Sequence, residues 1–300
     1  MKIISHRKIF FVVSALLVAA SIVAMIVWGF PTGTDFTGGS ILEVSYVNQD
    51  RPDISEMDTK LSELSLGSFS LRPSGSSGLV LRTREISDTE KAKILGVFSQ
   101  DGTLQVNEER FNAVGPIVGN SLKSKSYKAI IVVLVMILLF ITFAFRKVSK
   151  PVSSWKYGFA AIVALAHDVI IPTGAYILLS RFTSAEIDLL FVTALLAILG
   201  FSVHDTIVVF DRVRENLQHN RETNSKETFE ETVGRGLMET MTRSINTSLT
   251  VILSLVVLYF LGSEATRNFV FVLVVGIIAG VYSSIFLASP LLVVLAGKRK

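Results

Sequence analysis

An apolar run at residues 187–210 reads IDLLFVTALLAILGFSVHDTIVVF and is long enough to cross a lipid bilayer as one helix. A spanning helix needs about 20 mostly apolar residues, because each residue adds about 1.5 Å across a hydrocarbon core of about 30 Å. Similar runs predict five further spans, at residues 9–29, 129–145, 155–179, 242–261 and 268–296. The sequence therefore predicts an α-helical polytopic membrane protein with six transmembrane helices.

The composition of the 300-residue chain agrees with this prediction. Hydrophobic residues make up 50% of the chain and charged residues 18%, whereas a typical soluble domain has about 25% charged residues. The chain has no cysteine, which excludes a disulfide scaffold and a cysteine–zinc site. The sequence has no nucleotide-binding, zinc-protease or nucleophile-elbow motif. We therefore expect a transport or translocation protein without a metal or organic cofactor, and not an enzyme.

The distribution of Lys and Arg predicts the orientation in the membrane. Sixteen of the 29 Lys and Arg residues lie at the termini and around the loops that follow the second and fourth spans, whereas the short loops opposite hold only Arg181 and Arg267. The positive-inside rule then places both termini and the loop 211–241 in the cytoplasm. Because topology explains the excess positive charge, we expect no nucleic-acid partner. The apolar run at residues 9–29 is longer than the core of a signal peptide, which has about 7 to 15 residues. An uncleaved anchor over 1–29 is therefore favoured over a cleaved signal.

Residues 30–128 are polar enough to fold in water, and the predicted topology places them outside the cytoplasm as one domain before the remaining spans in 129–300. Helices are expected after the candidate cap Asp53 and after the capping box that Ser87 and Glu90 can form. Alternating or β-rich segments predict strands at 40–47, 68–72, 79–84 and 104–114. This β-α-β-β-α-β order is the ferredoxin-like one. The domain has neither His nor Cys, so we expect a binding or lever module.

Four ionisable side chains lie inside two predicted spans, His167 and Asp168 in the third and His204 and Asp205 in the fourth. A charge near the bilayer centre costs on the order of 2.5 to 3.5 kcal/mol on insertion scales, so these groups need partners, neutralisation or water. They can be hydrogen-bonded pairs that hold helices together, or a proton relay or cation site. We favour the relay, with Asp205 as the sharper candidate, because it lies about 9 Å along the helix from the predicted cytoplasmic end at Asp211.

The fifth span must include polar residues to reach a spanning length, and Arg243 is one of them. This residue can supply a counter-charge to Asp205, which protonation of the acid would release, or it can be a boundary arginine that only sets topology. Gly276 and Gly280 form a small-residue stripe that predicts close helix packing in the sixth span. Phe229, Val233 and Leu237 recur every fourth residue and predict an amphipathic helix on the membrane surface within the inner loop.

Five segments carry a family resemblance. The most specific reads GFSVHDTIVVFDRVREN, and the others read DFTGG, GPIVG, AHDV and RSINTS, at residues 200–216, 35–39, 115–119, 166–169 and 243–248. Together they resemble the SecD/SecF family of accessory subunits of the bacterial Sec preprotein translocase, within the RND superfamily of proton-driven membrane proteins. The resemblance covers the whole chain. One departure is His204, where the family usually has Asn.

The resemblance implies a role in late protein export, driven by the proton motive force, with the outer domain moving as protons pass inward. It maps the family's intramembrane acid and arginine onto Asp205 and Arg243, with Asp168 in support, and we place His204 and His167 beside them in the candidate proton relay. The coupling ion is expected to be the proton, with sodium as the alternative. The implied partners are SecD, the SecYEG channel, YajC and an unfolded preprotein, and the implied location is the bacterial inner membrane with the domain in the periplasm.

The resemblance also implies that Asp35, Gly38 and Gly39 couple the first span to the outer domain, and we group Gly115 and Pro116 with them. The glycine pair also suits a turn with only a structural role. Two other functions stay open, namely an RND-type proton-coupled exporter of a small solute and a translocon scaffold that uses no gradient.

Overall fold

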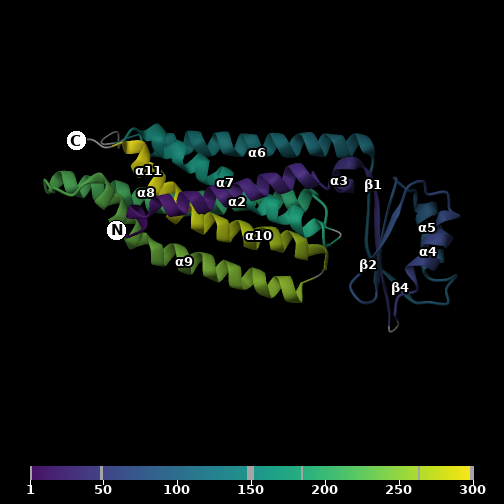
Figure 1. Ribbon diagram of the computed structural model, residues 1–300. Coiled ribbons are helices and arrows are strands. Elements are labelled where there is room, and N and C mark those ends of the chain that lie inside the picture. The colour runs from purple at the N-terminus through teal and green to yellow at the C-terminus, as the bar shows by residue number, and fades with distance from the viewer. Residues whose placement is uncertain (1, 48–49, 147–151, 184, 263, 298–300) are drawn as a thin grey trace. The chain divides into compact units, whose positions relative to one another are not determined.

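The computed structural model describes residues 2–47, 50–146, 152–183, 185–262 and 264–297 (Figure 1). The chain forms two compact units, each of which is described by itself. The helical unit lies within Met1–Phe30, Lys128–Ala185 and Leu190–Lys300, and the mixed α/β unit comprises Pro31–Tyr127 and Glu186–Leu189. The mixed unit thus contains a short segment from far along the chain in addition to the residues that follow the first span.

Within the described ranges, six helices are long and apolar enough to cross a membrane, which confirms the predicted fold class. The first is α2, which follows the short helix α1 (Lys2–Ser5). The sixth is a continuous helix over Thr266–Ala296, in which the π-helical turn η1 (Ser284–Ala288) separates α10 (Glu264–Ser283) from α11 (Ser289–Ala296). Helix α2 covers Arg7–Trp28, and the second to fifth are α6 (Pro116–Ala144), α7 (Ser154–Ser180), α8 (Leu189–Glu222) and α9 (Phe229–Leu261).

The helices of the region predicted as a cytoplasmic loop are longer than expected. Residues 211–241, predicted as a loop between two spans, are mostly helical, because α8 continues to Glu222 and α9 already begins at Phe229. A capping box between Thr228 and Glu231 starts α9, and its early apolar residues are buried against α8 rather than on a separate surface helix. The apolar spacing that suggested a surface helix therefore belongs to a helical hairpin.

Two span boundaries also differ from the prediction. Helix α6 begins at Pro116, well before residue 129, because proline at the first helical position is already set for a helix and polar residues extend it. The fourth span was predicted from Ile187, but α8 begins at Leu189. Ile187 instead pairs with the segment after α2, where it forms a parallel bridge with Thr32 and donates its N–H to the carbonyl of Pro31 at 2.7 Å.

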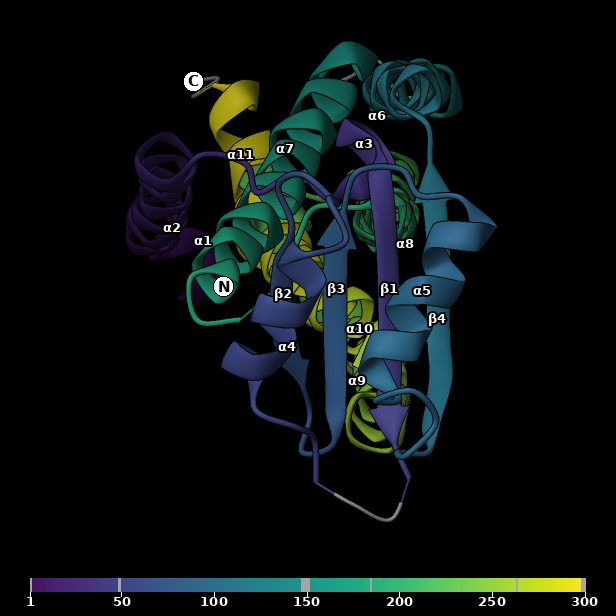
Figure 2. The same cartoon turned by 90° about the vertical axis from the view of Figure 1, so that its right-hand side faces the viewer.

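The mixed unit has the predicted ferredoxin-like order. Its elements are α3 (Thr34–Thr37), β1 (Gly39–Tyr46), α4 (Ile54–Ser62), β2 (Ser70–Ser74), β3 (Gly78–Thr83), α5 (Asp88–Phe98) and β4 (Val106–Val114). The strands form an antiparallel sheet in the order β2-β3-β1-β4, and α4 and α5 cover one face of it (Figure 2). The predicted caps are present, since Asp53 accepts the N–H of Ser55 and Ser87 forms a reciprocal capping box with Glu90.

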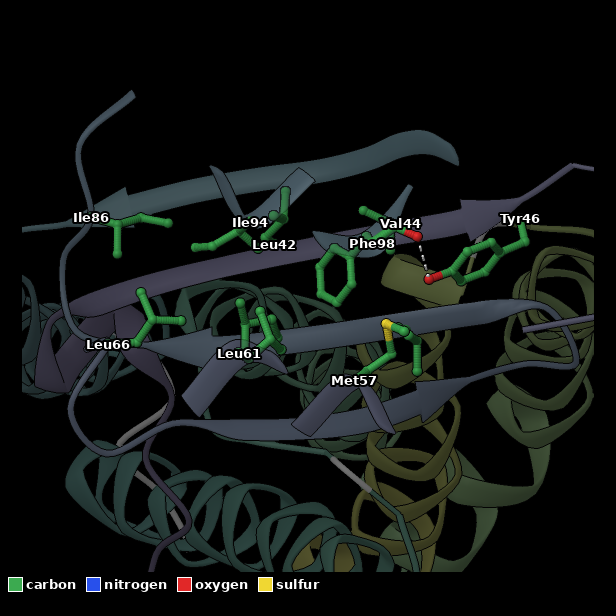
Figure 3. Packing of buried hydrophobic residues seen from close by; sticks show 11 residues of the cluster. Leu42, Val44, Tyr46, Met57, Leu61, Leu66, Ile86, Ile94 and Phe98 are labelled. Carbon is green, nitrogen blue, oxygen red and sulfur yellow. Dashed lines mark hydrogen bonds between the residues drawn. The ribbon is translucent and has the colours of Figure 1, made fainter. Parts of the chain in front are cut away.

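One hydrophobic cluster holds the sheet and the two helices of the mixed unit together (Figure 3). Its residues come from alternate positions of β1 and β3 and from the inner faces of α4 and α5. The hydroxyl of Tyr46 donates to the carbonyl of Phe98 at 3.2 Å inside this cluster, and burial raises the pKa of Tyr46 to about 12. The buried members are Leu42, Val44, Tyr46, Met57, Leu61, Leu66, Leu79, Leu81, Ile86, Ile94 and Phe98.

In the helical unit, α7 packs against α2 and α10, and α10 also packs against α9 (Figure 1). Helices α7, α8 and the sixth helix are about half buried over their apolar windows, while α2, α6 and α9 leave most of their surface uncovered. Apolar side chains on such surfaces suit lipid or another membrane protein. The polar groups of interest therefore lie where α7, α8, α9 and the sixth helix meet.

Candidate functional site

Asp168 is the most fully hydrogen-bonded group in the helical unit's interior. Its side chain is completely buried, and its Oδ1 lies 2.9 Å from Nδ1 of His167. Its Oδ2 accepts hydrogen bonds from the hydroxyls of Ser202 on α8 and Ser283 on α10, the latter at 2.7 Å. Three helices thus converge on this carboxyl, as expected for a group that holds a bundle together.

His167 is buried beside Asp168 and packs against an aromatic ring. The imidazole stacks on the ring of Tyr282 with centroids 5.8 Å apart, and the Tyr282 hydroxyl donates to the backbone carbonyl of Phe10 at 3.0 Å. The buried Nε2 of His167 has no hydrogen-bond partner within the described part of the chain. One nitrogen is therefore engaged by Asp168 and the other is left without a protein partner.

Asp205 is buried as well, but its carboxyl is much less satisfied. Its Oδ2 has no hydrogen-bond partner among the residues that the structure describes. The hydroxyls of Ser244 on α9 and Ser284 in η1 interact with the carboxyl, but neither completes a hydrogen bond to Oδ2. The buried hydroxyl oxygens of Ser244 and Ser248 also lack partners in the described ranges, so three unsatisfied oxygens occur where α8 and α9 pack. Such groups are expensive in a bilayer and indicate a functional site.

His204 does not share this interior. Its side chain is exposed on α8, whereas the next residue, Asp205, is buried. Successive helical residues point about 100° apart, so the two side chains of this pair face different surroundings. The sequence grouped His204 with the relay, and the structure places it on the outer surface of the unit.

Arg243 lies in an open groove between α8 and α9 rather than against the carboxyl of Asp205. Its side chain is exposed, and no ion pair between it and Asp205 occurs in the described structure. The groove has a volume of about 420 Å³, and its charged lining includes Arg212, which pairs with Glu239 at 2.6 Å. Its other lining residues are Val208, Asp211, Glu215, Thr240 and Arg243.

The groove is nonetheless near Asp205 along both helices. Val208 lines it and lies three residues after Asp205 on α8, while Arg243 directly precedes Ser244, the α9 neighbour of that acid. Residues three apart on a helix lie on one face about one turn from each other. The groove therefore begins about one helical turn beyond Asp205 on α8, and Arg243 lines it from α9.

The glycines of the sixth helix allow it to approach α8 closely. A Cβ added at Gly276 would overlap the side chain of Ile198, and one at Gly280 would lie 3.1 Å from the Cβ of Ser202. Because Ser202 donates to Asp168, this close approach also brings Ser283 within reach of the same carboxyl. The small-residue stripe thus positions part of the polar interior.

The two predicted coupling motifs contact each other inside the mixed unit. Gly38 and Gly39 have φ values of +79° and +124°, and a Cβ at Gly38 would lie 2.8 Å from the Cα of Pro116. A Cβ at Gly119 would lie 2.9 Å from the backbone nitrogen of Gly38, and Gly115 packs beside Glu85. Only glycine fits such positive φ values and close backbone approaches without strain. The motifs therefore form one tightly packed junction.

Asp35 ties this junction to the start of α8. Its buried carboxyl accepts the backbone N–H of Leu189 through Oδ2 and the side-chain amide of Asn112 through Oδ1, both at 3.1 Å. Nearby, Glu186 forms a 2.7 Å ion pair with Arg82, although burial raises the pKa of Glu186 more than this arginine lowers it. Leu189 is the first residue of the helix that carries Asp205.

Sequence reasoning missed the hydroxyl residues that surround the two intramembrane acids. Ser202, Ser283 and Ser284 contact or neighbour Asp168 and Asp205, and Ser244 and Ser248 lie one turn apart on α9. The spacing of Ser244 and Ser248 inside an otherwise apolar helix was the available signal. From the sequence alone, these polar residues are interpreted only as part of the segment that brings the fifth span to a sufficient length.

Comparisons with known proteins agree with this architecture. The family model described as "Protein export membrane protein SecD/SecF, C-terminal" matches residues 96–298. A protein translocase subunit SecF of Thermobaculum terrenum is 40% identical, with 97% of this chain and 92% of that protein covered. The SecF of Anaerolinea thermophila is 33% identical, with coverage of 98% and 94%.

A solved structure has the same fold. The crystal structure of SecDF, a translocon-associated membrane protein from Thermus thermophilus, superimposes with a TM-score of 0.83 at 29% identity and covers 99% of this chain. SecDF in the super-membrane-facing form gives a TM-score of 0.63 over 96% of this chain. The chain spans only 39% and 37% of those two longer proteins. With six spans, a ferredoxin-like unit and relatives that match over nearly the whole length, the chain belongs to the SecD/SecF family of protein-export membrane proteins.

Proposed function

We propose that this subunit of the Sec export machinery uses the proton motive force to assist preprotein translocation, with Asp205 as the group that takes up and releases the proton. The observation that carries the proposal is the unsatisfied, buried Oδ2 of Asp205, in contrast to the fully bonded Asp168. A carboxyl that no donor fixes can change its charge without breaking a structural hydrogen bond. Asp168 and His167 then support the site by holding α7 against α8 and α10.

Arg243 supplies the counter-charge in this proposal. It is not paired with Asp205 in the structure, but it is exposed and lines the groove that Val208, one turn after Asp205, also lines. An ionised Asp205 would attract the guanidinium, and a protonated Asp205 would leave it in the groove, which is the arrangement observed here. His204 faces away from this path, so we propose that it tunes the surroundings of the acid and does not carry the proton itself.

The junction around Asp35 provides a physical link from the site to the mixed unit. Asp35 holds the first residue of α8, and Gly38 and Gly39 pack on Pro116, the first residue of α6. In this proposal a movement of α8 acts first on Leu189, the residue that Asp35 holds within the mixed unit. One proton that crosses 100 mV releases about 2.3 kcal/mol, which is several times thermal energy and sufficient to bias a two-state movement.

We further propose the partners and location. SecD is the expected companion, since the matching SecDF chain is longer than this one and α2, α6 and α9 leave large apolar surfaces uncovered. The SecYEG channel, YajC and an unfolded preprotein complete the proposed assembly in the bacterial inner membrane. The positive-inside rule supports cytoplasmic termini and a periplasmic mixed unit. The proposed coupling ion is the proton, and the alternative is sodium. Translocation measured after sodium in the medium is replaced would distinguish the two ions.

The test replaces Asp205 with Asn in membrane vesicles and measures preprotein translocation with and without an imposed proton gradient. We expect stimulation by the gradient to be lost while translocation without the gradient is unchanged. Glu222→Gln is the control, because Glu222 lies on the same helix but is exposed and is not among the residues that line the groove. Undiminished stimulation in Asp205→Asn, at normal protein levels, would reject the proposal in favour of a scaffold.

A further inference from the structure

The sixth helix changes its geometry beside the two intramembrane acids. Its π-helical turn covers Ser284–Ala288, and Pro290 follows at the start of α11. Proline has no N–H to donate, and its ring collides with the carbonyl four residues earlier, so a regular α-helix cannot pass through this point undisturbed. A π turn relieves the collision by widening the helix. The hydroxyl of Ser289 donates to the carbonyl of Ser284 at 3.0 Å and stabilises the widened turn.

Two consecutive serines at the start of this turn contact different acids. Both are completely buried. Ser283 donates to Oδ2 of Asp168 at 2.7 Å, whereas the Ser284 hydroxyl lies 2.8 Å from that of Thr206 and also interacts with the carboxyl of Asp205. The point where α10 passes into the π turn therefore lies beside both acids, with Ser283 at the end of α10 and Ser284 as the first residue of the turn.

The hydrogen bond between Ser284 and Thr206 can run in either direction. When Asp205 is ionised, the Ser284 hydroxyl is free to donate to it only if Thr206 donates to Ser284. When Asp205 is protonated, the carboxyl can donate to Ser284, which then donates to Thr206. The protonation state of Asp205 thus selects the direction of a short chain of hydroxyl groups.

We propose that Ser283 and Ser284 are positioning residues that couple the two intramembrane acids through the π turn imposed by Pro290. The proposal rests on the proposed function, because it takes Asp205 as the group that changes its protonation. Reversal of the Ser284 hydrogen bonds shifts the first turn of η1, and the adjacent Ser283 transmits that shift to Asp168 and to the α7–α8 contact that Asp168 holds. The acid at the proton path and the acid that anchors the helices are then linked by two neighbouring residues.

Several other titratable or charged groups lie near this region, and each of them can also affect the titration of Asp205 or Asp168. His204 is the neighbour of Asp205 on α8, Arg243 approaches from α9, and Asp168 and His167 belong to α7. The sixth helix contributes the ring of Tyr282, which stacks on His167. Ser284→Ala, Ser284→Thr, Pro290→Ala and Ser14→Ala retain each of these groups, whereas Asp205→Asn and Asp168→Asn serve to assign the two carboxyl bands.

The test follows the carboxyl bands of Asp205 and Asp168 by infrared difference spectroscopy of the full chain in lipid, assigned through Asp205→Asn and Asp168→Asn. We expect Ser284→Ala to shift the Asp205 band to higher frequency, since the carboxyl loses a hydrogen-bond partner, and to move the pH at which it titrates. We also expect titration of Asp205 to perturb the Asp168 band in the unmodified protein and not in Ser284→Ala. Ser14→Ala is the control, because Ser14 is a buried serine of α2 whose hydroxyl has no partner among the described residues.

Two further variants keep the test decisive. Ser284→Thr retains a hydroxyl and should restore the coupling, even if Ser284→Ala folds poorly. Pro290→Ala removes the cause of the π turn and should weaken the effect of Asp205 on the Asp168 band while both bands remain. The coupling between Asp205 and Asp168 would be disproved if Ser284→Ala and Ser14→Ala gave the same Asp205 and Asp168 bands and the same titration of Asp205. The proposed function would still stand in that case, provided that Asp205→Asn abolished stimulation by the gradient. If Asp205→Asn had no effect on stimulation, the proposed function itself would fail.

Discussion

Replacing Asp35 with Ala should release the start of α8 from the mixed unit. The substitution removes both acceptors of the carboxyl, so the backbone N–H of Leu189 and the side-chain amide of Asn112 each lose a 3.1 Å hydrogen bond. An unsatisfied donor costs about 1 to 3 kcal/mol. Because Leu189 is half-buried and water can replace part of the bond, we expect about 1 to 2 kcal/mol for its amide.

Hydrogen–deuterium exchange of the full chain measures this loss directly. A cost of about 1 to 2 kcal/mol corresponds to exchange of the Leu189 amide that is about 5- to 30-fold faster. The amide of Ile187 is an internal control, since it donates to the carbonyl of Pro31 at 2.7 Å and does not use Asp35. Exchange at Leu189 that stays at the level of the unmodified protein would refute the assignment of Asp35 as the anchor of α8.

The conservative variant Asp35→Asn separates geometry from charge. The amide oxygen can still accept from Leu189, and its NH2 group can donate to Asn112 if the amide of Asn112 turns over. We therefore expect slow exchange at Leu189 in Asp35→Asn. If Asp35→Asn has normal exchange at the Leu189 amide but weaker stimulation of translocation by the gradient, coupling needs the negative charge of Asp35. If exchange and stimulation are both normal, the hydrogen bonds of residue 35 are sufficient. Asp58→Asn, on the exposed side of α4, serves as the control for a charge change.

Two further predictions concern packing and pH. Gly174→Ala should destabilise the helical unit, because the added Cβ would overlap both the side chain and the Cα of Ser21 on α2. The Cβ added in Gly200→Ala meets no atom within 4 Å, so this variant should be neutral. Thermal unfolding in detergent compares the two variants, and equal unfolding midpoints would contradict the close packing of Gly174 on Ser21. The hydrogen bond from Arg84, followed by that from the Ser87 backbone, lowers the pKa of Glu90 to about 2 from 4.5. The ionised Glu90 carboxylate therefore stabilises the fold above pH 4.5, and this contribution is lost as the pH falls toward 2. The unfolding midpoints of the unmodified protein and Glu90→Gln should converge over that interval. A difference that stays constant with pH would contradict the lowered pKa of Glu90.

The features that could be predicted from the sequence have causes close together in the chain. Apolar runs give the six spans, and the capping box of Ser87 with Glu90 gives the start of α5, because both depend on residues within one or two turns. The bridge between Thr32 and Ile187 could not be predicted in the same way, since it joins residues more than 150 positions apart. The helical hairpin over 211–241 was missed because hydropathy marks where a helix crosses the bilayer and not where the helix ends.

The two His-Asp pairs show why the site itself needed the structure. In sequence they are alike, and each is an adjacent histidine and aspartate in an apolar helix. Their surroundings differ, because Ser283 at the end of α10 donates to Asp168, whereas Oδ2 of Asp205 has no hydrogen-bond partner among the described residues. Donors that bond a carboxylate favour its charged form, whereas a buried carboxyl that lacks such donors is more easily held neutral. The difference in hydrogen bonding between the two acids therefore depends on a helix more than 70 residues further along the chain, which no local pattern around either pair indicates.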